Sequence, residues 1–236
     1  MATLKLGSNV ASQLDAGASI VAAADTVDTR LIKPRLSAFG GAQRTYKAAH
    51  EQVQAAEAHV TAAQMRLGEL DVDQDEAVTA LAAALIVDGQ RRTNPFNVFG
   101  VPAPGKLMEL AVADEAKAVH QLVAAVQRGK GASKPTLQAA QAAEKAARAV
   151  EQALAEIEKL QGSVRAARHR RDAVAQAWAT ALAALKRGAR AAADDGAPTL
   201  YATLFDRPRP AKTKSAKPMP APVPSPAPQP VPNAAA

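Results

Sequence analysis

The chain has 236 residues, no cysteine and a formal net charge of +7; 48% of its residues are hydrophobic but only 3% are aromatic. The lack of cysteine excludes disulfide bonds, thiolate nucleophiles and thiolate metal sites. Alanine supplies much of the apolar content, so we expect thin layers of helix rather than a thick globular core, because alanine is the strongest helix former.

The N-terminal segment, residues 1–33, is expected to be disordered or to form one weak helix over 8–25. Val10, Leu14 and Val21 are its few large apolar residues at helical spacing. It has no charged start followed by a long apolar run, and nothing in the chain reaches the roughly 18 apolar residues of a membrane span. We therefore expect a cytoplasmic protein with no membrane span.

The segment from Pro34 to about Asp88 has a seven-residue repeat that predicts a long coiled-coil helix. The face that this repeat forms, the seam, has large residues that are followed three positions later by alanine. Asp73 and Glu76 have the spacing of an N-cap and capping box, which would start a second helix. The repeat keeps its phase across them, which favours one helix, but the sequence leaves both readings open. The large seam residues are Phe39, Tyr46, Val53, Val60, Leu67 and Leu81.

The stretch NPFNVFGVPAPG, residues 94–105, contains two of the four phenylalanines of the chain. Asn94-Pro95 favours a turn. We predict that Phe96 and Phe99 fold back and close the end of the helical bundle. The alternative is that these two residues form a partner-binding loop.

A shorter helix is predicted over 104–128, and a second long helix runs from Pro135 to about Arg190, with Ser133 as its N-cap. This long helix repeats the large-residue and alanine seam, and its large positions are Val150, Ile157, Val164, Arg171, Trp178 and Leu185. Because alanine seams suit antiparallel pairing, we pair the two long helices within one chain.

This pairing fixes a register along the hairpin. Phe39 is expected near Leu185, and Leu67 near Ile157. The charged seam residue Arg171 then faces Val53. We expect Glu51 and Glu57 to lie close enough to pair with Arg171, as well as with Arg165 and Arg168. A charged residue in a seam can fix the register at some cost in stability.

A last short helix is predicted over 198–205, and residues 206–236 are expected to be disordered. Every second residue from Pro218 to Pro232 is proline, which excludes helix and sheet and favours extended polyproline II. The stretch PAKTKSAKP resembles in composition the Lys-Ala-Pro tails of linker histones and of some bacterial DNA-associated proteins. The candidate polyanion contacts of this tail are Arg207, Arg209, Lys212, Lys214 and Lys217.

Motifs for catalysis or metal binding do not appear. Asp71, Asp73 and Asp75 have the spacing of an EF-hand loop start, but Glu76 and Ala82 occupy its glycine and glutamate positions. The four histidines have no metal-binding pair at three- or four-residue spacing. Glycine-rich nucleotide motifs are also missing. We expect no catalytic residues, no cofactor, no metal site and no enzymatic activity.

The predicted fold is all-α: an elongated antiparallel helical hairpin, an alanine-rich coiled coil, with a small three-helix head and a disordered proline-rich C-terminal tail. Its predicted domains are 1–33, 34–205 and 206–236. The predicted function is that of a scaffold, spacer or adaptor without catalysis, with an unidentified protein partner. Arg30, Lys33, Arg35, Arg44 and Lys47 are expected to meet Lys186, Arg187 and Arg190 at one end of the rod.

Two alternative functions remain open. One is weak, nonspecific binding of nucleic acid through the tail and this basic rod end. The other is a surface coat on a membrane or storage granule. Phasins, which coat such granules, are similar to this chain in their alanine-rich helices and, in some members, Lys-Ala-Pro tails.

Overall fold

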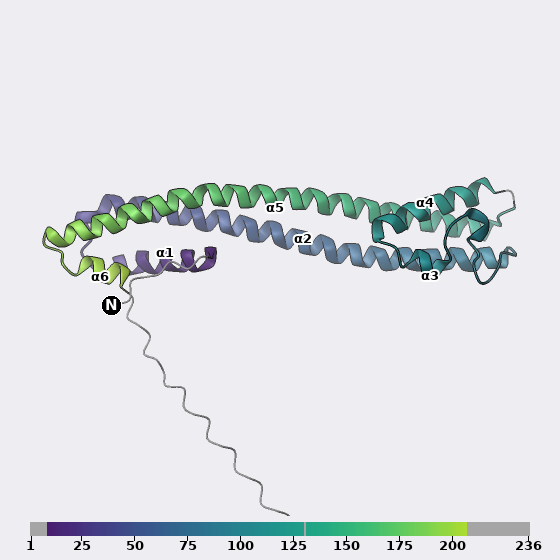
Figure 1. Cartoon of the computed structure of the whole chain (residues 1–236), viewed down its shortest axis with the longest axis horizontal. Coiled ribbons are helices and arrows are strands. Elements are labelled where there is room, and N and C mark those ends of the chain that lie inside the picture. The colour runs from purple at the N-terminus through teal and green to yellow at the C-terminus, as the bar shows by residue number, and fades with distance from the viewer. Residues whose placement is uncertain (1–8, 130, 207–236) are drawn as a thin grey trace, which may run out of the picture.

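The structure, a computed structural model, describes residues 9–129 and 131–206. Figure 1 shows a long rod in which α2 and α5 run side by side, with α1 and α6 at one end and α3 and α4 at the other. We call these the open end and the head. In chain order the elements are α1 (Val10–Ala24), η1 (Arg30–Ile32), α2 (Lys33–Val87), η2 (Asn97–Phe99), α3 (Pro104–Leu107), α4 (Val112–Arg128), α5 (Lys134–Asp194) and α6 (Leu200–Phe205).

The antiparallel pairing of the two long helices is confirmed. α2 has 55 residues and α5 has 61, so at ~1.5 Å per residue they are roughly 80 and 90 Å long. α2 is one continuous helix, and Asp73 and Glu76 do not begin a new one. The Ser133 hydroxyl caps α5 as predicted, by accepting a hydrogen bond from the Thr136 N–H. The Ser133 N–H in turn donates to the Asp88 carboxylate over 2.9 Å, which ties the start of α5 to the end of α2.

Contacts along the rod agree with the predicted register. The Trp178 ring of α5 lies 6.0 Å from the Phe39 ring and 5.6 Å from the Tyr46 ring of α2, measured between centroids. Farther along, Arg168 of α5 forms an ion pair with Glu57 of α2 at 2.6 Å. Phe39 also shares a buried cluster with Leu185, as the pairing predicts.

The predicted partners of Arg171 were wrong. Its Nη2 lies 2.7 Å from the carboxylate of Asp172, the next residue along α5, while Glu57 binds Arg168. The carboxylate of Glu51 lies 3.8 Å from Lys47 on its own helix. Arg171 occupies a seam position between apolar residues, and its side chain, only 19% exposed, bends toward the exposed carboxylate of Asp172.

The head contains a first hydrophobic cluster, in which α4 packs across α2 and α5. Val119, Leu122 and Val126 of α4 are buried against alanines of α5. The predicted helix over 104–128 is in fact two helices, α3 and α4, separated at 108–111. In a continuous helix Leu107 would point roughly 120° away from the buried stripe of α4, at 100° per residue. The break lets Leu107 enter the core, where it is fully buried.

The open end contains a second cluster, formed where α1, η1 and α6 pack against the ends of α2 and α5. Ile20 of α1, Ile32 of η1 and Phe205 of α6 are all essentially inaccessible to solvent. α1 begins with a side-chain cap, because the Asn9 carboxamide oxygen accepts a hydrogen bond from the Ser12 N–H over 2.7 Å. The rod therefore has a separate apolar core at each end.

The position four residues after each position of the large-residue seam, Gln74 included, explains where the short helices lie. We call these the flank positions. At the two ends of the rod most of them are apolar and buried under a short helix, as for Val78 and Leu85 at the head and Leu182 at the open end. In the middle they are polar, and α2 and α5 run side by side there without a short helix over them. The polar flank residues are His50, Glu57, Gln64, Gln161 and Arg168.

Candidate functional site

The loop over 94–105 closes the head. The Phe96 N–H donates to the Asn94 side chain over 3.0 Å, and the Phe96 side chain is fully buried. Phe99 packs partly buried against the same cluster. The predicted packing of both phenylalanines is confirmed, and Val98 is a large hydrophobic side chain of this loop that is 63% exposed. Pro95, like Phe96, is buried.

Beside this loop, the head contains a buried polar cluster between α2 and α4. Glu115, in the first turn of α4, is 2% exposed, and Gln74, at a seam position of α2, is fully buried. Asp71 and Asp75 lie next to them on α2, and each has a buried carboxylate oxygen without a hydrogen-bond partner. Burial, reinforced by the charge of Asp75, raises the pKa of Asp71.

Glu115 is the most perturbed acid of this cluster. Burial raises its pKa to about 7, and the charges of Asp75 and Asp71 act in the same direction. The nearby Gln74 amide has the opposite effect. A carboxyl in this environment is mostly the neutral acid below pH 7 and ionises as the pH rises through about 7.

On the α5 side of α4, His120 lies between two carboxylates. Its Nδ1 is 2.8 Å from Glu144, and its Nε2 is 3.2 Å from Glu151. Burial alone would raise the pKa of Glu144, but hydrogen bonds from His120 and Arg148 outweigh it and lower the pKa. This set holds α4 to α5 by polar contacts at the edge of the apolar core.

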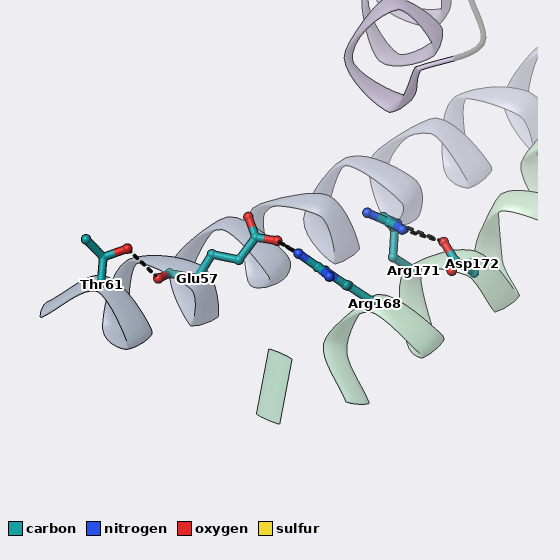
Figure 2. A network of polar contacts seen from close by, with 5 residues as sticks. All are labelled: Glu57, Thr61, Arg168, Arg171 and Asp172. Atoms are coloured by element: carbon teal, nitrogen blue, oxygen red, sulfur yellow. Dashed lines mark hydrogen bonds and ion pairs between the residues drawn. The ribbon is translucent and has the colours of Figure 1, made fainter. Parts of the chain in front are cut away.

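The middle of the rod carries the polar contacts drawn in Figure 2. Arg168 reaches across from α5 to Glu57 of α2, and Thr61 donates to the backbone carbonyl of Glu57 over 3.2 Å. A shallow hollow of about 380 Å³ lies here, lined by Val60, Val164 and these polar groups. The charged residues around this hollow include the polar flank residues Glu57 and Arg168, so this stretch of the rod faces water.

At the open end, a hydrogen-bonded chain fastens α1 to the hairpin. The Trp178 indole N–H of α5 donates to Gln43 Oε1 over 2.6 Å, and Gln43 Nε2 donates to the Leu14 carbonyl of α1 over 2.8 Å. The Tyr46 hydroxyl donates to the Gln13 side chain over 2.9 Å. Gly17 leaves the space that the Gln43 amide fills. Every buried polar group of Gln43 is thereby satisfied, which fixes where α1 lies.

Cations gather on the surface of this end. Arg190 stacks 4.9 Å from the Tyr201 ring, Lys186 lies 5.6 Å from the Phe205 ring, and Arg35 lies over Gly188. Of the described cations at this end, six have no carboxylate within ion-pair distance, whereas Arg30 is paired with Asp28 and Lys47 with Glu51. The six are Lys33, Arg35, Arg44, Lys186, Arg187 and Arg190. The candidate tail contacts, Arg207, Arg209, Lys212, Lys214 and Lys217, lie outside the described residues.

Two further findings bear on function. No group of three or more His, Asp or Glu side chains within 9–129 and 131–206 is placed to hold a metal ion. In the same residues, no helix is both long enough and apolar enough to cross a bilayer.

Comparisons of the chain with protein-family models, with curated proteins and with solved structures find no match. The features of the rod itself are therefore the basis for inferring its function.

The sequence reasoning missed Gln43, Gln74 and Glu115. Gln74 carries a signal, since it is a polar residue at a seam position between Leu67 and Leu81, and Gln43 carries one because it lies one turn from both Phe39 and Tyr46. Glu115 gives no comparable signal, because an acidic residue in the first turn of a helix is favoured there by the helix dipole whether or not it is buried.

Proposed function

We propose that this protein is a non-catalytic spacer or adaptor that binds separate protein partners at the two ends of its rod. The observation that supports this proposal is the separation of two apolar cores by a polar two-helix segment. Tyr46 belongs to the open-end cluster and Val78 to the head cluster, so at ~1.5 Å per residue they are roughly 50 Å apart along α2. Such a layout gives two differently shaped ends held at a fixed distance.

Single cysteines provide the test, because the chain has none of its own. Thr93→Cys places an exposed thiol at the head, and Ala191→Cys places one at the open end. Each variant, carrying a photo-crosslinker on its thiol, is expected to capture its own distinct set of proteins in cells. An identical set from both positions, or no specific protein from either, would contradict the proposal.

A shortened rod separates end-binding from binding along the middle. Deleting 54–67 from α2 together with 158–171 from α5 removes two heptads from each helix at the same level, or roughly 21 Å. It removes both partners of the Glu57–Arg168 ion pair and keeps Gln43 with Trp178. A folded shortened rod is expected to retain both partner sets, and loss of either set would assign that partner to the middle of the rod.

Nonspecific binding of nucleic acid is a second candidate, favoured by the unpaired cations at the open end. Contacts of this kind work through release of counterions, so affinity falls steeply with salt and shows no preference for sequence. The test is fluorescence anisotropy on duplex DNA across a salt series, comparing the full chain with residues 1–206. Loss of binding on truncation assigns it to the tail, and equal binding assigns it to the open end. If neither form binds at low salt, the candidate is wrong.

A further inference from the structure

The first turn of α4 lies against the most acidic stretch of α2. Glu115 is 2% exposed there, and the groups of α2 that face it are Asp71, Asp75 and Gln74. Glu115 Oε1 and both polar atoms of the Gln74 amide are buried without a hydrogen-bond partner of good geometry. From the other side of α4, the nearby charged groups of α5 are Glu144 and Glu151, both next to His120, and Arg148, which is paired with Glu144. No cationic side chain faces Glu115 among the groups that perturb it.

A buried carboxyl placed among other carboxyls is tolerated only in its neutral form. Its ionised form would lose its hydration and would also be repelled by the neighbouring negative charges. The neutral form also has a proton to donate in a cluster rich in acceptors. Contact between the first turn of α4 and α2 therefore depends on the proton of Glu115.

The remainder of α4 does not share this dependence. Val119, Leu122 and Val126 are buried in the apolar core of the head, which holds the later turns in place. Residues 108–111, between α3 and α4, are not helical and provide a pivot at the start of the first turn.

We propose that the first turn of α4 is a pH-sensitive latch, closed on α2 when Glu115 is protonated and released when Glu115 ionises. This goes beyond a spacer function, because it gives the head two states. The closed state favours the proton, since Glu115 has a pKa of about 7 there and an ordinary value of 4.5 when solvated. By linkage, the equilibrium constant for opening rises about tenfold between pH 6 and pH 8.

Thiol labelling of the full chain tests the latch. Ala116, next to Glu115, is fully buried, whereas Ala124 on the same helix is exposed. The labelling rate of Ala116→Cys divided by that of Ala124→Cys reports opening and cancels the effect of pH on the thiol. This ratio is expected to rise about tenfold from pH 6 to pH 8.

Three variants test whether Glu115 causes the pH dependence of this labelling ratio. Added to the Ala116→Cys chain, Glu115→Gln should abolish the pH dependence and keep the ratio low, because the amide mimics the neutral acid. Asp75→Asn should move the dependence to lower pH, because it removes a neighbouring negative charge. His120→Gln is the matched control and should leave the dependence in place.

A flat ratio in the parent chain, or an unchanged rise in Glu115→Gln, would overturn the latch. Suppression of the rise by millimolar Mg²⁺ would also overturn it, by showing that a cation, not the proton, holds the cluster closed.

Discussion

Gly17→Ala is expected to loosen the open end, although alanine is ordinarily the better helix residue. In the middle of a helix this exchange stabilises by roughly 0.5–1 kcal/mol. At position 17, however, the new Cβ would overlap the Gln43 amide, with its Cδ 2.5 Å and its Nε2 2.8 Å away. Gln43 cannot move aside cheaply, because it is hydrogen bonded to both Trp178 and Leu14.

The expected loss in the free energy of unfolding follows from the two ways in which the overlap between the new Cβ and the Gln43 amide can be relieved. Overpacking of a tight core costs about 1–3 kcal/mol, and displacement of Gln43 leaves the buried Trp178 N–H without an acceptor, which costs about 1–3 kcal/mol. After the gain in helix propensity is subtracted, the free energy of unfolding should fall by about 1–2 kcal/mol. The assay is urea unfolding followed by circular dichroism and by the fluorescence of Trp178, the single tryptophan.

Gly41→Ala is the matched control, because nothing lies within 4 Å of a Cβ at that position of α2. It should stabilise the protein by roughly 0.5–1 kcal/mol. Adding Gln43→Ala to Gly17→Ala should remove most of the steric cost, which a double-mutant cycle measures. If Gly17→Ala stabilises as much as Gly41→Ala does, the Gln43 amide is not fixed between α1 and α5 and the reasoning fails.

Three more predictions concern the head and the seam. Phe96→Ser should lower the melting temperature far more than Phe99→Ser, because Phe96 is fully buried and Phe99 only partly, and truncation of a core phenylalanine costs about 3–5 kcal/mol; equal shifts in thermal melts would contradict this. Ala56→Leu should overpack the alanine seam and cost about 1–3 kcal/mol, so an unchanged melting temperature would count against close packing there. The raised pKa of Glu115 implies stability that is present below pH 4.5 and lost as the pH rises to about 7, on the order of 1–3 kcal/mol. Urea titrations across this range should show that decline in the parent chain and not in Glu115→Gln.

The hairpin could be predicted because a seven-residue repeat that keeps its phase over many turns identifies one buried face along each long helix. A break in either helix would have shifted the phase of the repeat. The flank positions also carry information that the seam alone does not. Leu182 and Val78 indicate a third helical layer at the ends, whereas Glu57 and Arg168 indicate none in the middle. Reading those positions would have placed α1 and α6 in the fold as well as α4.

Other features depend on side-chain choices that the repeat does not determine. Arg171 pairs with its neighbour Asp172, while Glu57 pairs with Arg168, and the repeat alone does not say which arginine takes Glu57. The break before α4 arises from the direction in which Leu107 must point, which is known only once the core of the head is assembled. The burial of Glu115 likewise follows from how α4 is seated, not from its local sequence.

The division of the apolar core between the two ends also shapes how the rod comes apart. Each cluster has its own short helices, and the thin stretch between them shares few buried side chains with either. The two ends are then separate foldons, and loss of one need not carry the other with it. Heating should give two transitions in calorimetry, with the van't Hoff enthalpy smaller than the calorimetric enthalpy. Native-state hydrogen exchange should accordingly show two protected islands in α2, around Tyr46 and around Leu81, separated by faster-exchanging amides.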